Sequence, residues 1–188
     1  MKKLSNFYFI ILILPFLFTV LNSNGQSFKN DEKWTRFNYK KMSVSMPQAT
    51  KQRDSLNVNL FLSEIDSAVA LITSVVPNSG LNTKDSVFQK ALEMNGLDTL
   101  KAIAQVSLVI GSSTLTSLEK IKLVSGISGL EYSFRYDDLK SNKPMHTFML
   151  IFLNNDFFYC LSATGTEDSL ERLLHYKHLF FNSLNISQ

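Results

Sequence analysis

Cysteine is almost absent from this sequence, because Cys160 is the single one in 188 residues. One cysteine excludes an intramolecular disulfide, so the thiol is buried, paired with another chain, or reactive. Cys160 lies among aromatic residues in the stretch FFYCLSA, where free cysteine usually behaves as a small hydrophobic side chain. We therefore expect a buried thiol, because nothing in the sequence orients a histidine toward it for thiol catalysis.

An excess of one charge sign is absent as well. The formal net charge is +3, and two of the lysines, Lys2 and Lys3, lie at the start of the chain. Without residues 1–25 the chain is nearly neutral, which leaves no field to hold nucleic acid or an anionic membrane. The remaining basic group is loosely spaced, which indicates solvated positions: Lys40, Lys41, Lys51 and Arg53.

Glycine is scarce, and no glycine-rich phosphate loop is present. Gly126 and Gly129 are too sparse for such a loop and lie between predicted strands. The paired carboxylates Asp137 and Asp138 lie in a polar stretch that ends at Pro144, which is typical of solvated turn residues. The sequence therefore predicts no cofactor.

A hydrophobic run near the N-terminus, Phe7 to Leu21, is too short for a typical membrane span. At ~1.5 Å per residue it reaches about 22 Å, whereas the hydrocarbon core of a bilayer is ~30 Å thick. Pro15 also disfavours a straight spanning helix. A basic start, an apolar run and a polar patch together are typical of a secretory signal peptide. A retained membrane anchor is the alternative.

These features predict the organisation of the chain. Residues 1–25 are the signal peptide, residues 26–33 a linker, and residues 34–188 a single domain. We expect the mature protein to begin near Gln26, to have no integral membrane span and to be periplasmic or extracellular. A domain of this size needs no disulfide or metal to fold.

The domain begins with alternating apolar and polar residues from Phe37 to Pro47. Met42, Val44 and Met46 share one side, which predicts a half-buried strand that ends at Pro47. The stretch NVNLFLSE repeats this pattern, and Ser125 to Gly129 marks a turn between two later strands. In the second of these strands four residues share one face: Leu130, Tyr132, Phe134 and Tyr136.

Three further segments are apolar on both faces. They are SAVALITSVV, MHTFMLIFL and FFYCLSA, and the last two flank a hairpin signal at 154–156. Such strands belong in the interior of a sheet that is covered on both sides, because soluble proteins avoid exposed rows of large apolar groups.

Two segments show helical periodicity. The first runs from Asn82 or Thr83 to a C-terminal glycine, Gly96. The second follows Thr164 and Glu167, whose spacing fits a capping box. Its apolar stripe consists of Leu170, Leu173, Leu174, Lys177, Phe180, Phe181 and Leu184. We predict an α+β fold in which a mostly antiparallel sheet is flanked by helices on both faces, an α/β/α sandwich.

This layout resembles the PsbP-like superfamily, including its DcrB-like bacterial envelope proteins. The resemblance is carried by the proline-terminated first strand, by YSFRYDD, and by HTFMLIFLNNDFFYCLSATGTEDSLERLLHYKHLFFNSL. It covers about Trp34 to Ile186. It implies an antiparallel sheet with flanking helices and a non-enzymatic accessory or binding role, and it implies no catalytic residues.

One set of residues suits a metal ion. Glu171, His175 and His178 are spaced i, i+4, i+7, so on a helix they lie within about 60° of one another. A carboxylate with two imidazoles suits zinc. The alternative is that this is the solvent face of the helix. His146 opens an apolar strand and is interpreted as a strand-edge or core histidine.

A second set suits a ligand pocket between sheet and helix. It consists of aromatic residues that alternate along two strands: Tyr132, Tyr136, Phe157 and Tyr159. They could line a cavity or simply form core.

Three functions follow from these observations. The first is a non-enzymatic envelope protein that acts as an interaction or assembly accessory module with an envelope protein partner. The second is a small-molecule or lipid-binding protein with a pocket between sheet and helix. The third is a metal-binding protein or enzyme that uses the Glu171, His175 and His178 face.

Overall fold

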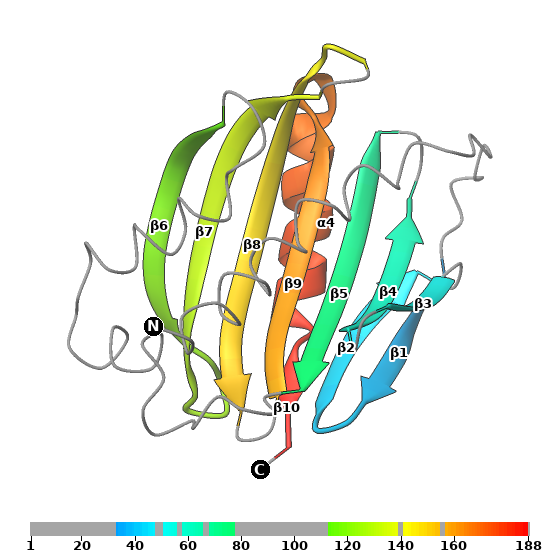
Figure 1. Ribbon diagram of the computed structural model, residues 1–188, viewed down its shortest axis with the longest axis vertical. Coiled ribbons are helices and arrows are strands. Elements are labelled where there is room, and N and C mark those ends of the chain that lie inside the picture. The colour runs from blue at the N-terminus through cyan, green and yellow to red at the C-terminus, as the bar shows by residue number, and fades with distance from the viewer. Residues whose placement is uncertain are drawn as a thin grey trace.

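The computed structural model describes residues 33–47, 51–55, 58–65, 68–77, 113–138, 141–154 and 157–187. These residues form two antiparallel sheets and one α-helix (Figure 1). The predicted helix from Asn82 or Thr83 to Gly96 and the predicted signal peptide lie outside the described residues. Among the described residues, no helix combines the length and apolar character needed to cross a bilayer.

The larger sheet contains seven strands within the described residues, and every neighbouring pair is antiparallel. The prediction of an antiparallel α+β fold is therefore confirmed. In spatial order the strands are β3 (Lys51–Ser55), β4 (Val58–Glu64), β5 (Val69–Pro77), β9 (Phe157–Thr166), β8 (Pro144–Asn154), β7 (Ser128–Asp137) and β6 (Thr114–Lys122).

The smaller sheet joins distant parts of the chain. It contains β1 (Trp34–Tyr39), β2 (Met42–Pro47) and β10 (Asn185–Ile186). Beyond β10 the backbone N–H of Ser187 donates to the carbonyl of Lys41 at 2.8 Å. Segments from both ends of the domain therefore share one sheet.

The segment Phe37 to Pro47 is a hairpin rather than one continuous strand. Lys40 has a φ of 54°, in the left-handed region, so the chain turns there between β1 and β2. The second half matches the prediction, because Met42, Val44 and Met46 are all buried. Uninterrupted alternation hid the turn, since two lysines occupy it without glycine or proline.

The central strands of the larger sheet, β5, β9 and β8, are buried on both faces, as the two-sided apolar segments predicted. On β9 the consecutive residues Cys160 and Leu161 point to opposite faces of the sheet, and both are buried. The helix α4 (Leu170–Asn182) covers one face, where it packs on β9, β5 and β8 (Figure 1). No described helix lies over the other face, so flanking by helices on both faces is not confirmed.

The C-terminal helix starts later than predicted. Thr164 still belongs to β9, where its hydroxyl hydrogen-bonds the Thr147 hydroxyl at 2.8 Å. A short 3-10 helix, η2 (Glu167–Ser169), precedes α4, and Ser169 occupies the N-cap without a side-chain capping bond. The predicted capping box is therefore wrong, because cross-strand pairing holds Thr164 in the sheet.

The apolar stripe of α4 was predicted correctly at its centre. Leu173, Phe180 and Phe181 are buried against the sheet, whereas Leu174 at the edge of the stripe is 45% exposed. The end of β9 passes close to Ala68, the residue just before β5. Only glycine fits at Gly165, since a Cβ there would lie 2.8 Å from the Ala68 carbonyl oxygen. Because α4 packs on β5, β9 and β8, it lies over the middle of the seven-stranded sheet.

Candidate functional site

The three residues predicted to bind metal lie on the exposed face of α4. The Asn182 side-chain amide lies 2.9 Å from His178 Nε2, and the His175 ring meets Tyr176 edge-on. Glu171 and His175 line an open depression of 460 Å³ that does not include His178. Within the described residues, no group of three or more His, Cys, Asp or Glu side chains is placed to hold a metal ion.

The four aromatic residues predicted to line a pocket lie on two different faces of the sheet. Tyr159 and Phe157 belong to the core under α4, whereas Tyr132 pairs with Met149 and Tyr136 with Met145 on the opposite face. Burial raises the pKa of Tyr136, and hydrogen bonds to Thr164 and Thr147 oppose the shift. The structure therefore does not bring these four residues together.

Cys160 and His146 are also far from a catalytic arrangement. Burial raises the pKa of the Cys160 thiol to about 12, and a hydrogen bond with Ser74 opposes the shift. His146 belongs to β8 and directly opposes Arg135 of β7. Its Nε2 lies 4.0 Å from Glu167, which pairs with Arg135 at 2.5 Å. Cys160 is a buried core residue, as predicted.

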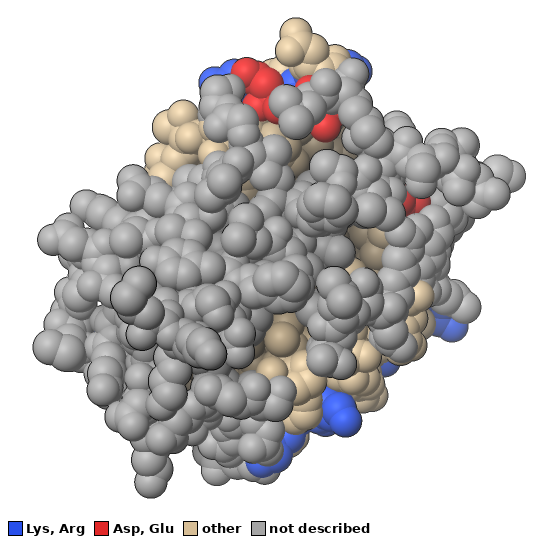
Figure 2. All heavy atoms as spheres, viewed as in Figure 1, with Lys and Arg blue, Asp and Glu red and all other residues tan. Residues whose placement is uncertain are grey.

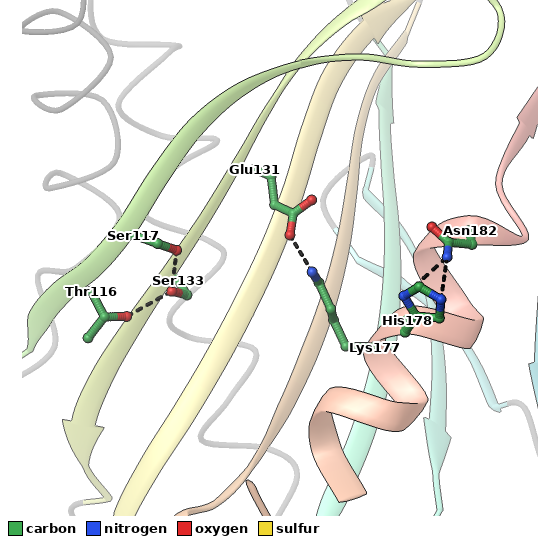
Figure 3. A network of polar contacts seen from close by, with 7 residues as sticks. All are labelled: Thr116, Ser117, Glu131, Ser133, Lys177, His178 and Asn182. Atoms are coloured by element: carbon green, nitrogen blue, oxygen red, sulfur yellow. Dashed lines mark hydrogen bonds and ion pairs between the residues drawn. The ribbon is translucent and has the colours of Figure 1, made fainter. Parts of the chain in front are cut away.

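The most open part of the helix-bearing face lies beside α4 and not beneath it. We define the open strip as the α4-side surface of β6 and β7, which the helix does not cover (Figure 3). Every side chain of β6 is partly or fully exposed, whereas Ser133 on the α4 side of β7 is only 5% exposed. The open strip is therefore the part of this face that another molecule could contact.

A hydroxyl cluster lies on the open strip near the outer edge of the sheet. The register between β6 and β7 shifts between Leu115 and Ser117, which is a β-bulge. The hydroxyls of Thr116 and Ser117 lie 2.7 Å and 2.5 Å from the hydroxyl of Ser133 (Figure 3). The bulge thus places two hydroxyl side chains against a single residue of the neighbouring strand.

An ion pair connects the open strip to the helix. Lys177 of α4 pairs with Glu131 of β7 (Figure 3). The Lys177 ammonium also lies 5.6 Å from the ring centroid of Phe148 and 5.4 Å from that of Phe181. Its placement in the apolar stripe was correct, since the aliphatic stem follows the core while the charge reaches β7.

An apolar groove lies at the end of the open strip, next to the β6–β7 turn and the C-terminal end of α4. We define this hairpin groove by its lining residues, and its volume is 350 Å³. The lining residues are Ile121, Lys122, Leu123, Val124, Ser125, Leu150, Phe181, Asn182, Leu184, Asn185 and Ile186. Val124 at its rim is fully exposed.

Sequence reasoning did not find the hairpin groove. Its walls come from the β6–β7 hairpin, from β8 and from the segment after α4, and only the folded topology brings these together. The sole local signal was an apolar residue, Val124, directly before the predicted turn at Ser125 to Gly129. Turn tips are normally polar, so an exposed valine there was a feature to explain.

Comparisons with solved structures show the fold class. CyanoP, a cyanobacterial PsbP from Synechocystis sp. PCC 6803, matches with a TM-score of 0.59 at 11% identity, covering 88% of this chain and 98% of that one. LpqN, described as involved in cell envelope biogenesis of Mycobacterium tuberculosis, matches with a TM-score of 0.50 at 12% identity, covering 88% and 100%.

No family model and no curated protein sequence matches the chain. At these low identities the structural matches establish the fold and not the function. The protein therefore has a PsbP-like α+β fold, as the sequence resemblance indicated.

Proposed function

We propose that this protein is an exported, non-enzymatic envelope protein that acts as an interaction or assembly accessory module. The observation that carries the proposal is the surface around the β6–β7 turn, where fully exposed Val124 adjoins an apolar groove. The groove and the valine at its rim together form apolar surface that a bound partner would remove from water. The partner would be another protein of the envelope.

Two further points support this proposal. LpqN, which shares the fold, is described as involved in cell envelope biogenesis. The reactive groups that the sequence suggested are held apart or buried: the Cys160 thiol is buried in the sheet, and the histidines of α4 face solvent. The described residues thus favour a contacting role over a chemical one.

Site-specific photocrosslinking in the native cells tests the proposal. A benzoylphenylalanine residue at Val124 should give an adduct with a discrete envelope protein. The matched control places the same residue at Lys143, which is exposed near the opposite end of β7 and β8. Equal labelling from both positions, or no adduct from Val124, would contradict the proposal.

A second function is favoured by the groove itself. Its 350 Å³ lies at the lower end of the range of about 300–1,000 Å³ typical of small-molecule sites. We propose ligand binding there as the alternative, at a different position from the aromatic set that the sequence suggested. Calorimetric titration with small amphipathic compounds tests this alternative, and lack of any saturable binding would contradict it.

A further inference from the structure

The hairpin groove has an apolar interior. Leu150, Phe181 and Ile186 form its buried part, with exposed fractions of 2%, 8% and 5%. Ile121 and Leu184 are partly buried and pack against the same core. These side chains surround the groove with aliphatic and aromatic surface, which suits a hydrocarbon chain.

The polar side chains of the groove can all donate hydrogen bonds, and none of them is acidic. Lys122, Ser125 and Asn185 are among the lining residues, and no Asp or Glu is. The Ser125 hydroxyl oxygen is buried and has no hydrogen-bond partner within the described residues. A buried hydroxyl without a partner costs free energy, so a ligand oxygen there would be stabilised.

The charge around the groove has the same sign. Lys122 is the one charged residue among those that line the groove, and its side chain is exposed. Elsewhere on the molecule both charge signs reach the surface (Figure 2). The groove therefore favours a ligand that carries negative charge.

We propose that the hairpin groove binds a free single-chain carboxylate of medium length. The hydrocarbon chain lies against Leu150, Phe181 and Ile186, and the carboxylate accepts hydrogen bonds from Ser125 and from Lys122. A volume of 350 Å³ suits one chain better than a two-chain lipid. This inference rests on the second of the proposed functions, ligand binding, and not on the protein–protein interaction.

Titration of the full chain with three probes tests the proposal. Decanoate should bind saturably, butanoate at least tenfold more weakly, because each buried CH₂ contributes about 0.8 kcal/mol. Decyltrimethylammonium, which has the same chain and the opposite charge, should bind several-fold more weakly than decanoate. Equal binding of decanoate and decyltrimethylammonium would overturn the carboxylate assignment, although ligand binding in the groove would survive.

A matched pair of variants locates the charge. Lys122→Glu should weaken decanoate binding about three- to tenfold and reverse the preference between the two decyl probes. Lys120→Glu makes the same charge change two residues away on the same exposed strand, but Lys120 does not line the groove. Equal effects of the two substitutions would overturn the proposed contact.

Two further results complete the test. Ser125→Ala should weaken decanoate about three- to tenfold, which corresponds to the loss of one hydrogen bond. Binding only to anionic phospholipid vesicles, with no saturable binding of decanoate, would overturn the proposal in favour of a membrane surface. Neither result bears on crosslinking from Val124, so failure here is distinguishable from failure of the interaction proposal.

Discussion

The face of the large sheet that carries α4 has two unlike halves. Under the helix, Leu71, Tyr159 and Leu161 have no exposed surface, and the packing is mainly apolar. On the open strip, β7 carries Glu131, Ser133 and Arg135 on the same face, and they form ion pairs and hydroxyl contacts. One face of one sheet thus supplies both a core and an exposed polar surface, and the position of a single helix decides which.

The largest expected effect distinguishes the covered half from the helix surface. Phe180→Ala should lower the free energy of unfolding by about 3–5 kcal/mol, because it leaves a cavity at a fully buried site. Leu179→Ala, on the neighbouring residue that is 41% exposed, should cost about 0.5 kcal/mol or less. Urea denaturation measures both, and similar losses would show that α4 is not docked as described.

A somewhat smaller effect tests the close approach of β9 to the chain before β5. Gly165→Ala should destabilise the protein by about 1–3 kcal/mol, because the added methyl group meets the Ala68 carbonyl oxygen at 2.8 Å. Gly126→Asn is the control, since its site is open and asparagine tolerates the left-handed φ of 83°. Thermal unfolding that ranks the control as the more damaging change would contradict this packing.

The buried thiol gives a pH dependence. Burial raises the pKa of Cys160 from 9.0 to about 12, so the native state binds its proton more tightly than the unfolded state. Its contribution is complete below pH 9 and is lost as pH rises toward 12, by about 1.4 kcal/mol per pH unit. The difference in unfolding free energy between the wild type and Cys160→Ala should fall over this window. A constant difference would contradict burial of the thiol.

The smallest effect belongs to the open strip. Lys177 and Glu131 have side chains that are 22% and 26% exposed, so their pairing should contribute about 1 kcal/mol or less. A double-mutant cycle with Lys177→Met and Glu131→Gln measures the coupling, which should decrease as salt is added. A coupling of several kcal/mol would mean that the open strip is as tightly constrained as the covered half.

The sequence predicted the antiparallel strands and the buried side of β2 because period-two alternation is a local property. It also placed Cys160 in the core. It did not predict that Tyr132 and Tyr159 face opposite sides, since alternation fixes the residues that share a face within one strand and not the register between strands. The hairpin groove was beyond reach for the same reason, because Ile121, Leu150 and Ile186 meet only through the topology.

The pairing of β10 with β2 has a consequence for the order of folding. The Ser187 hydroxyl donates to the Lys41 carbonyl across 146 residues of chain. Contacts of such long separation form late, because loop closure costs entropy before the contact stabilises anything. We therefore expect the β8–β9 hairpin to assemble early. The small sheet should be completed last, when β10 adds to β2. β2, which leaves the ribosome early, must therefore wait for its second partner until almost all of the remaining chain has been made.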